Sequence, residues 1–312
     1  MESQILNTST TDSSCATGAF DFNLWMTQQL QHVEQALQQW VGVGAPADLG
    51  EAMRYAVLDG GKRLRPLLVL AAAQSVQGHA QAALRAACAV ELIHAYSLVH
   101  DDMPCMDNDV LRRGKPTVHV QFGEARALLA GDALQALSFE LLTPSAQEVP
   151  AAMQATLCRI LAQAAGAHGM AGGQAIDLAS VGVALDEAAL RRMHSLKTGA
   201  LLQASVRLGA ACAEVAQPVQ QALERYATAL GLAFQVVDDV LDVVADAATL
   251  GKTPGKDAAN DKPTYVSLMG LDAARTHAQD LLAQALLALQ DSGLPDVRAL
   301  TALAHMVVAR SH

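Results

Sequence analysis

Apolar residues recur at three- and four-residue spacing along most of the chain, and this periodicity predicts amphipathic helices. Glycines and prolines separate the periodic stretches. We expect helices at about 23–40, 49–58, 66–78, 80–102, 118–142, 150–166, 171–180, 186–212, 218–245 and 271–290, with one more near the C-terminus. The pattern contains no persuasive strand and no internal repeat, so it predicts an all-α protein.

Several predicted helices are apolar on every side, which is typical of the inner helices of a bundle. No linker is long enough to divide the chain, although 312 residues would suffice for two domains. We therefore expect one large helical bundle over residues 23–312. Residues 1–22 contain neither Lys nor Arg and are expected to form a loosely ordered tail without a secretory signal. The polar loop 251–263 is rich in Gly, Pro, Lys and Asp, and such loops are often functional.

Composition narrows the classes of partner and the cellular compartment. The chain has 31 acidic and 21 basic residues and a net charge of −10, which disfavours binding to nucleic acids or anionic membranes. Its five cysteines are scattered and form no CxxC pair, which indicates reduced thiols and a cytoplasmic protein. No uninterrupted apolar stretch reaches the roughly 18 residues that a membrane span requires.

The first candidate site is the acidic segment that follows the apolar helix predicted at 80–102. Asp101, Asp102, Asp107 and Asp109 place four carboxylates within nine residues. Burial of several carboxylates is costly unless something neutralises them. The segment is therefore either a solvated acidic loop or the binding site of a cation.

Three further aspartates, Asp238, Asp239 and Asp242, occur in a predicted helix between apolar residues. Asp238 and Asp242 are one turn apart, so their Cβ atoms are expected about 5–6 Å apart on one face. Mg²⁺ prefers hard oxygen ligands of this kind and keeps several waters. A charged stripe on a surface helix is the alternative, which the flanking Val, Leu and Phe residues disfavour.

Basic residues beside glycines and prolines form the counterpart of these carboxylates. They are Lys62, Arg63 and Arg65 after Gly60-Gly61, Arg112, Arg113 and Lys115 around Gly114, Lys197 before Thr198-Gly199, and Lys252, Lys256 and Lys262 in the polar loop. Glycines at a helix N-terminus favour anion binding, although any one of these cations alone could be a solvated surface residue. Together with the carboxylates and the apolar helices, they indicate a diphosphate with an apolar tail, held through Mg²⁺ on one side and Lys or Arg on the other.

Seven motifs in a fixed order carry a resemblance to a known family. They are GGKRLRP at 60–66, IHAYSLVHDDMPCMDND at 93–109, LRRGKPTVH at 111–119, GGQAIDL at 172–178, KTGAL at 197–201, FQVVDDVLD at 234–242, and GKD with DKPTY at 255–265. They resemble the trans-isoprenyl diphosphate synthases, and most closely the bacterial farnesyl diphosphate synthases. The resemblance covers nearly the whole chain from about residue 23.

The resemblance implies the all-α isoprenoid synthase fold around a deep central cavity, in a homodimer. It also implies three Mg²⁺ ions per active site, held by two aspartate motifs that face each other across the cavity mouth. The implied metal-binding residues are Asp101, Asp102, Asp107, Asp238, Asp239 and Asp242. Within the first motif, Asp101 and Asp107 are favoured as direct ligands.

The implied activity is the condensation of isopentenyl diphosphate with dimethylallyl and then geranyl diphosphate. Lys197, Thr198 and Gln235 match positions at the reacting end of the allylic substrate. Arg112, Lys252 and Lys262 match contacts to the allylic diphosphate, and Lys62, Arg65, His94 and Arg113 match the isopentenyl diphosphate site. Released pyrophosphate would accept the proton, so no side-chain base is required.

The spacing before the first aspartate motif bears on product length. Ser97 and Tyr96 precede Asp101 by four and five residues, and a helical turn of about 5.4 Å is close to the length of one isoprene unit. In the family that the chain resembles, a bulky residue here forms the cavity floor. Tyr96 then favours a C15 product, with Ser97 leaving room for the ten-carbon chain. Tyr96 could instead be a packed core aromatic.

Other activities remain open on the same motifs. A geranyl or geranylgeranyl diphosphate synthase would share the fold, and a non-catalytic regulatory subunit would normally lack one of the motifs. A terpene cyclase would carry an Asn/Ser/Glu-type second metal motif, which is absent here. Asn108 stands where close relatives often have Asp, outside the metal positions.

Overall fold

The computed structural model describes residues 20–309 apart from 59, 181, 183–184 and 245–263. The first helices are α1 (Phe22–Trp40), α2 (Leu49–Val57), α3 (Leu64–Ser75) and α4 (Ala80–Asp101), followed by the short strands β1 (Leu111–Arg112) and β2 (Lys115–Pro116). The middle of the chain forms α5 (Val118–Phe122), α6 (Glu124–Leu142), α7 (Ala151–Ala165) and α8 (Met170–Ala179). The rest forms α9 (Glu187–His194), the π-helix η1 (Ser195–Gly199), α10 (Ala200–Ala210), α11 (Gln217–Val244), α14 (Tyr265–Met269), α15 (Leu271–Asp291) and α16 (Arg298–Ala309). The predicted all-α class is confirmed.

Two hydrophobic cores share a central pair of helices. One core surrounds α4 and includes residues of α1, α2, α6 and α7, whereas the other surrounds α11, α15 and α16. Helices α3 and α10 contribute residues to both cores. They can lie close together because Gly209 has no side chain: a Cβ there would lie 2.2 Å from the Val69 carbonyl oxygen. This tight contact joins the two halves of the bundle.

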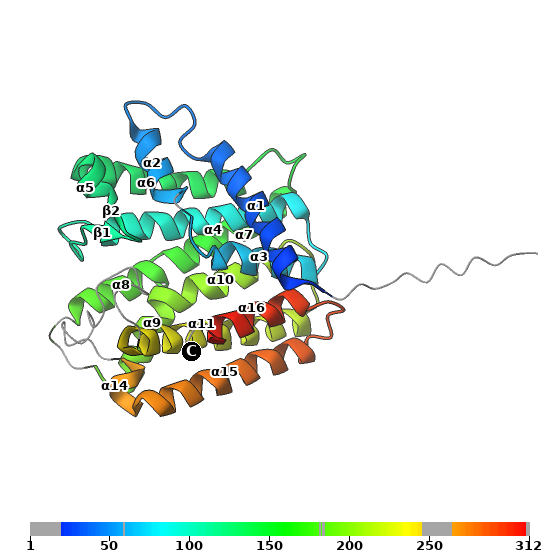
Figure 1. The fold of residues 1–312 in the computed structure, drawn as a ribbon. Helices are drawn as coiled ribbons and strands as arrows, with labels where there is room; N and C mark the ends of the chain where they lie inside the picture. The colour runs from blue at the N-terminus through cyan, green and yellow to red at the C-terminus, as the bar shows by residue number, and fades with distance from the viewer. Residues whose placement is uncertain (1–19, 59, 181, 183–184, 245–263, 310–312) are drawn as a thin grey trace, which may run out of the picture.

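Helix α4 lies inside the bundle and packs against α3, α6 and α10 (Figure 1). By length and composition it could cross a membrane, which differs from the expectation that no apolar stretch would qualify. However, 72% of its apolar window is buried inside the protein. The core helix of a globular protein passes the same test, so this property is weak evidence for a membrane span.

The structure differs from the predicted elements in four places. Gly123, with φ +87°, separates α5 from α6, where one helix had been expected. The run predicted at 186–212 contains the π-helix η1, and the short helix α14 was not predicted. Strands β1 and β2 form a small antiparallel hairpin, and both turn residues, Arg113 and Gly114, have positive φ as a type I′ turn requires. Two-residue strands are too short to show the alternation from which strands are predicted.

The elements that carry the predicted chemistry gather at one end of the bundle. The β1–β2 hairpin, α5, α8 and α14 lie together at the left of Figure 1, where α4 also ends. The opposite end contains the start of α1. Because the long helices pack side by side, motifs that are distant in sequence meet at this end of the bundle.

Candidate active site

Several of the predicted site residues converge on a cavity of about 360 Å³ between α4, α8 and η1. Seven of them line it: Arg65, His94, Tyr96, Ser97, Asp101, Lys197 and Thr198. Helix α8 adds apolar side chains, including Met170, Ala175 and Leu178. A wall that combines ionic groups with apolar ones suits a ligand with an anionic head and a hydrocarbon tail.

The first aspartate cluster begins where α4 ends. Asp101 is the last helical residue, and the following loop folds back so that the Asp107 amide donates to the Asp101 carbonyl oxygen at 2.8 Å. Asn108 adopts φ +51°, a left-handed conformation that Asn tolerates well. The loop therefore returns Asp107 to the backbone of Asp101, although the Asp107 side chain is exposed.

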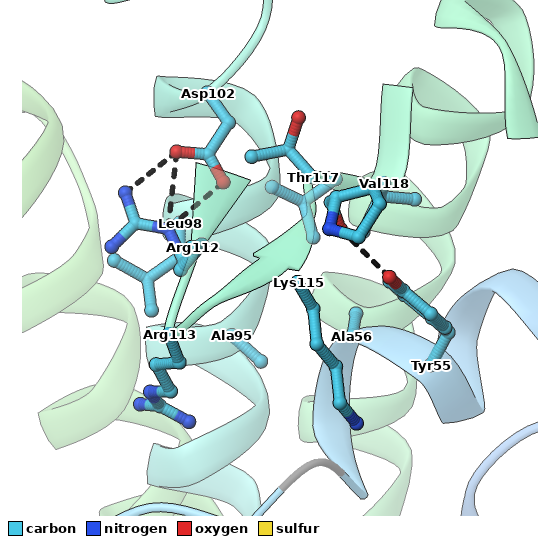
Figure 2. A pocket seen from close by; sticks show the side chains of 12 residues that line it. Tyr55, Ala56, Ala95, Leu98, Asp102, Arg112, Arg113, Lys115, Thr117 and Val118 are labelled. Carbon is cyan, nitrogen blue, oxygen red and sulfur yellow. Dashed lines mark hydrogen bonds and ion pairs between the residues drawn. The ribbon is translucent and has the colours of Figure 1, made fainter. Parts of the chain in front are cut away.

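Asp102 is almost completely buried and is bound by Arg112 of the hairpin (Figure 2). Arg112 Nε donates to both carboxylate oxygens at 3.0 and 2.9 Å, and Nη2 donates to Oδ1 at 2.6 Å. Burial raises the pKa of Asp102, and the guanidinium opposes this shift. The pair fixes the hairpin against the end of α4, next to a small pocket of about 50 Å³ that Arg113 and Lys115 also line.

Asp101 has the electrostatic environment of a cation site. Burial raises its pKa to about 6, the charge of Lys197 opposes the shift, and the nearby Asp107 adds to it. The negative charge of Asp101 is thus poorly stabilised by the protein alone, and a bound cation would stabilise it.

No three Asp, Glu, His or Cys side chains form a ready metal cage among the residues that the structure describes. Mg²⁺ usually binds through one or two carboxylates and completes its shell with water and substrate phosphates. A half-buried carboxylate such as Asp101 fits that kind of site, since the remaining ligands would come with a diphosphate.

The second aspartate cluster lies near the C-terminal end of α11. Asp239 is buried and accepts hydrogen bonds from Gln235 Nε2 and from the backbone amide of Tyr265, both at 2.8 Å. Asp242 is also buried, whereas Asp238 is half-buried. The charge of Asp238 acts on the guanidinium of Arg65, which places this cluster near the main cavity.

The three cations of the GGKRLRP motif have different environments. Arg63 is buried and forms ion pairs with Glu34 at 2.7 Å and Glu91 at 2.8 Å, so it stabilises the fold. Arg65 lines the cavity, and burial lowers the pKa of its guanidinium. Lys62 is exposed to solvent. Of these three neighbouring cations, Arg63 therefore stabilises the fold, whereas Lys62 and Arg65 are accessible to a ligand.

Glycines at the start of the same motif hold Arg113. Its Nη1 donates to the Gly60 carbonyl at 2.8 Å, and a Cβ at Gly61 would lie 2.9 Å from that nitrogen. Arg113 and Arg65 both lower the pKa of His94, for which burial is the largest cause. His94 is therefore neutral at physiological pH, and its imidazole can act as a polar group beside an anion.

Lys197 and Thr198 lie in the π-helix η1 between α9 and α10. Lys197 Nζ forms an ion pair with Asp177 Oδ2 at 2.6 Å. Gln174, on the same helix α8, lines the cavity, and both polar atoms of its amide are buried without a hydrogen-bond partner among the described residues. Neither Asp177 nor Gln174 was predicted as a site residue, although both belong to the GGQAIDL motif.

Some predicted residues do not lie at this cavity. Gln235 lines a different cavity of about 400 Å³, together with His194 and Gln203. Lys252 and Lys262 lie outside the described residues. The cavity therefore combines Asp101 of the first aspartate motif with part of the predicted cation set.

Comparison with known proteins identifies the class that this fold and site define. The family model for polyprenyl synthetases matches residues 46–302. The chain therefore belongs to the polyprenyl synthetase family.

The chain is similar to proteins whose names indicate more than one product class. It is 45% identical to a farnesyl diphosphate synthase of Haemophilus influenzae, over 91% of this chain and 98% of that protein. It is 42% identical to geranylgeranyl pyrophosphate synthase 7 of Arabidopsis thaliana, over 99% of this chain and 90% of that protein. The apo structure of an FPP/GFPP synthase from Zymomonas mobilis superposes with a TM-score of 0.82 at 42% identity, over 92% of this chain and 98% of that one.

Proposed function

We propose that the chain is a Mg²⁺-dependent prenyl transferase that condenses isopentenyl diphosphate with dimethylallyl and geranyl diphosphate. The products are (2E,6E)-farnesyl diphosphate and pyrophosphate. The observation that supports the proposal most strongly is the single cavity lined by Asp101, Lys197, His94 and Tyr96. It offers groups for a metal, an anion and a hydrocarbon chain in one place.

Two sets of residues would bind the two diphosphates. The allylic diphosphate would contact Lys197 and Arg112, with Lys252 and Lys262 from the polar loop. Isopentenyl diphosphate would contact Lys62, Arg65, Arg113 and the neutral His94. Since Arg113 is held by Gly60 and Arg65 is partly buried, these donors are oriented before the substrate arrives.

Asp101, Asp107 and Asp238 would hold Mg²⁺, with Asp102, Asp239 and Asp242 beside them. We propose three Mg²⁺ ions per active site. Bound Mg²⁺ supplies Lewis-acid stabilisation of the charge that develops on the leaving pyrophosphate. The hydrogen bonds to Asp102 and Asp239 suggest that these two act mainly by fixing the two motifs.

The chain's own groups would control the reacting carbons. The allylic C–O bond breaks and its electron pair leaves with pyrophosphate, and the dipoles of Thr198 and Gln235 would stabilise the cation. The isopentenyl double bond then supplies the electrons of the new C–C bond. Loss of a proton to pyrophosphate restores a double bond, and the apolar wall from α8 excludes water from the cation.

Product analysis tests this function. Purified protein would receive Mg²⁺, isopentenyl diphosphate and either dimethylallyl or geranyl diphosphate, and the dephosphorylated products would be separated by length. A dominant C15 alcohol supports the proposal. A C10 or C20 alcohol would retain the family and contradict the product length, and no condensation by folded protein would favour a regulatory subunit.

Tyr96 is the residue that we propose as the floor for the growing chain. Its side chain is buried, lines the cavity and packs edge-on against His100, with ring centroids 5.7 Å apart. Tyr96→Ala should shift the products from C15 to C20 or longer, because the removed ring opens space below Ser97. Tyr96→Phe keeps the ring and is the matched control, which should still give C15. Unchanged products from Tyr96→Ala would contradict the floor.

The proposal also covers the domain organisation, cellular location and oligomeric state of the enzyme. We propose one catalytic domain over residues 23–312 that acts in the cytoplasm as a homodimer and binds no nucleic acid. Leu128 and Leu129 on α6 and Val120 on α5 are about half exposed, which suits a subunit interface. Size-exclusion chromatography coupled to light scattering tests the dimer. A molar mass equal to that of one chain would contradict it.

A further inference from the structure

The ammonium group of Lys197 is held by one buried carboxylate. Lys197 Nζ lies 2.6 Å from Asp177 Oδ2, and the Asp177 side chain is only 8% exposed. Lys197 lines the cavity, whereas Asp177 is not among the residues that line it. Asp177 can therefore affect a ligand in the cavity through Lys197.

The backbone of Lys197 is fixed by the same helix. Gly173 precedes Asp177 by one helical turn, so both lie on the face of α8 that meets η1. A Cβ at Gly173 would lie 2.1 Å from the Lys197 amide nitrogen, so only glycine allows this approach. One face of α8 thus fixes Lys197 at its main chain and at its charged end.

The local helix geometry gives this pair a functional context. Lys197 lies in the middle of η1, and π-helical turns inside α-helices occur frequently at functional sites. A lysine side chain has many rotamers, and the entropy lost when it must be ordered during binding weakens its contribution. A buried ion pair orders it beforehand.

We propose that Asp177 is a positioning residue for the prenyl transfer reaction. Its carboxylate binds one of the three N–H donors of Lys197 and directs the other two toward the diphosphate of the allylic substrate. This inference rests on the proposed function of the cavity. It predicts that Asp177 acts on turnover through Lys197 and does not itself contact the substrate.

Asp177→Asn removes the charge and preserves the shape of the side chain. A displacement of a catalytic group by about 1 Å can cost about 100-fold, so we expect kcat to fall by about 10- to 100-fold. The KM for geranyl diphosphate should rise less than about twofold, since no donor to the substrate is removed. Glu148→Gln is the matched control: the Arg85–Glu148 pair has the same 2.6 Å separation outside the cavity, and this variant should keep the kcat of the unsubstituted chain.

A double-mutant cycle separates positioning from a purely structural role. In a Lys197→Met background, Asp177→Asn should cause no further loss of kcat, because the residue through which it acts is already gone. Asp177→Glu keeps the ion pair but shifts the ammonium by about one bond. It should lower kcat with little change in melting temperature, and it keeps the test valid if Asp177→Asn folds poorly.

Three results would overturn the inference. They are an unchanged kcat in Asp177→Asn and Asp177→Glu, an equal loss of kcat in the Lys197→Met background, or a loss of kcat that follows the melting temperature in every Asp177 variant. The unsubstituted chain is assayed in parallel. If it forms no condensation product, the proposed function fails and the inference fails with it. If it is active, the variants test Asp177 alone.

Discussion

Asp102 and Asp239 are each the second aspartate of an Asp-Asp pair, and they are 2% and 3% exposed. Asp102 is bound by the guanidinium of Arg112, whose side chain comes from a hairpin. Asp239 accepts hydrogen bonds from two neutral donors, the Gln235 amide and the Tyr265 backbone N–H. Among the described contacts, an ion pair holds Asp102, and two hydrogen bonds from neutral groups contribute to holding Asp239.

Adjacent aspartates of one motif can therefore have different roles. The second aspartate of each pair anchors a neighbouring segment, the hairpin in one case and α14 in the other. The first aspartate of each pair, Asp101 or Asp238, remains half-buried. We therefore expect substitutions at the first aspartates to affect chemistry and substitutions at the second to affect stability as well.

The largest expected effect is that of Asp101→Ala on turnover. Removal of a proposed Mg²⁺ ligand should lower kcat by about 1000-fold or more, because charge on the leaving pyrophosphate loses its stabilisation. Circular dichroism should show an unchanged fold, and kcat would be measured from the rate of product formation. Asp109→Ala, in the same acidic loop, is the control and should stay within about tenfold of the unsubstituted chain. Near-normal turnover by Asp101→Ala would contradict the metal assignment.

The apolar pattern of the sequence predicted the helical bundle correctly. The helices α4 and α11 have apolar residues throughout, and the aspartate clusters follow or interrupt those apolar runs. Seven of the predicted site residues line one cavity because those motifs lie at or near helix ends that gather at one end of the bundle.

The partner of each charged residue could not be predicted in the same way. Arg63 is the N-cap of α3 with φ +45° and Arg65 is in its first turn; Arg63 binds Glu34 and Glu91, while Arg65 lines the cavity. The partner of Lys197, Asp177, is 20 residues away and follows no local pattern. The position of the helix start and the tertiary contacts decide these pairs, and the sequence pattern specifies neither of them.

The next largest expected effect concerns Asp101 and the dependence of the free energy of unfolding on pH. The pKa of Asp101 is about 6 in the folded chain, above its usual value of 3.8, because burial disfavours the carboxylate. The folded state therefore binds more protons than the unfolded state between about pH 4 and 6. Its free energy of unfolding should fall as the pH rises through this range, by up to about 3 kcal/mol from Asp101.

Denaturant unfolding in the presence of a chelator measures this change. The unsubstituted chain and Asp101→Asn would be compared at about pH 4 and 6.5. Asp101→Asn lacks the titrating group and should show a smaller decrease over the same range. Burial also raises the pKa of Asp102, so some decrease should remain in the variant. An identical pH dependence in both proteins would show that Asp101 titrates normally.

The smallest expected effect is a difference in stability between substitutions of Asp102 and of Asp239. An ionised carboxylate only accepts hydrogen bonds, so Asp239 requires the NH₂ end of the Gln235 amide and leaves its carbonyl oxygen free for other contacts. In Asp239→Asn, the Gln235 amide can rotate and bond to the new NH₂ group, so both hydrogen bonds survive. A guanidinium has only donors, so Arg112 has no such adjustment in Asp102→Asn.

We therefore expect Asp102→Asn to lower the free energy of unfolding by about 2 kcal/mol and Asp239→Asn by about 1 kcal/mol or less. If Gln235 stabilises the allylic cation as proposed, Asp239→Asn should also lower kcat by about tenfold, because the rotated amide would present its NH₂ group in place of its oxygen. Denaturant titration and product assays on both variants measure the two effects. Gln235→Leu combined with Asp239→Asn should be no slower than Gln235→Leu alone. A further loss in the double variant would show that Asp239 acts on the reaction directly, as a metal ligand would.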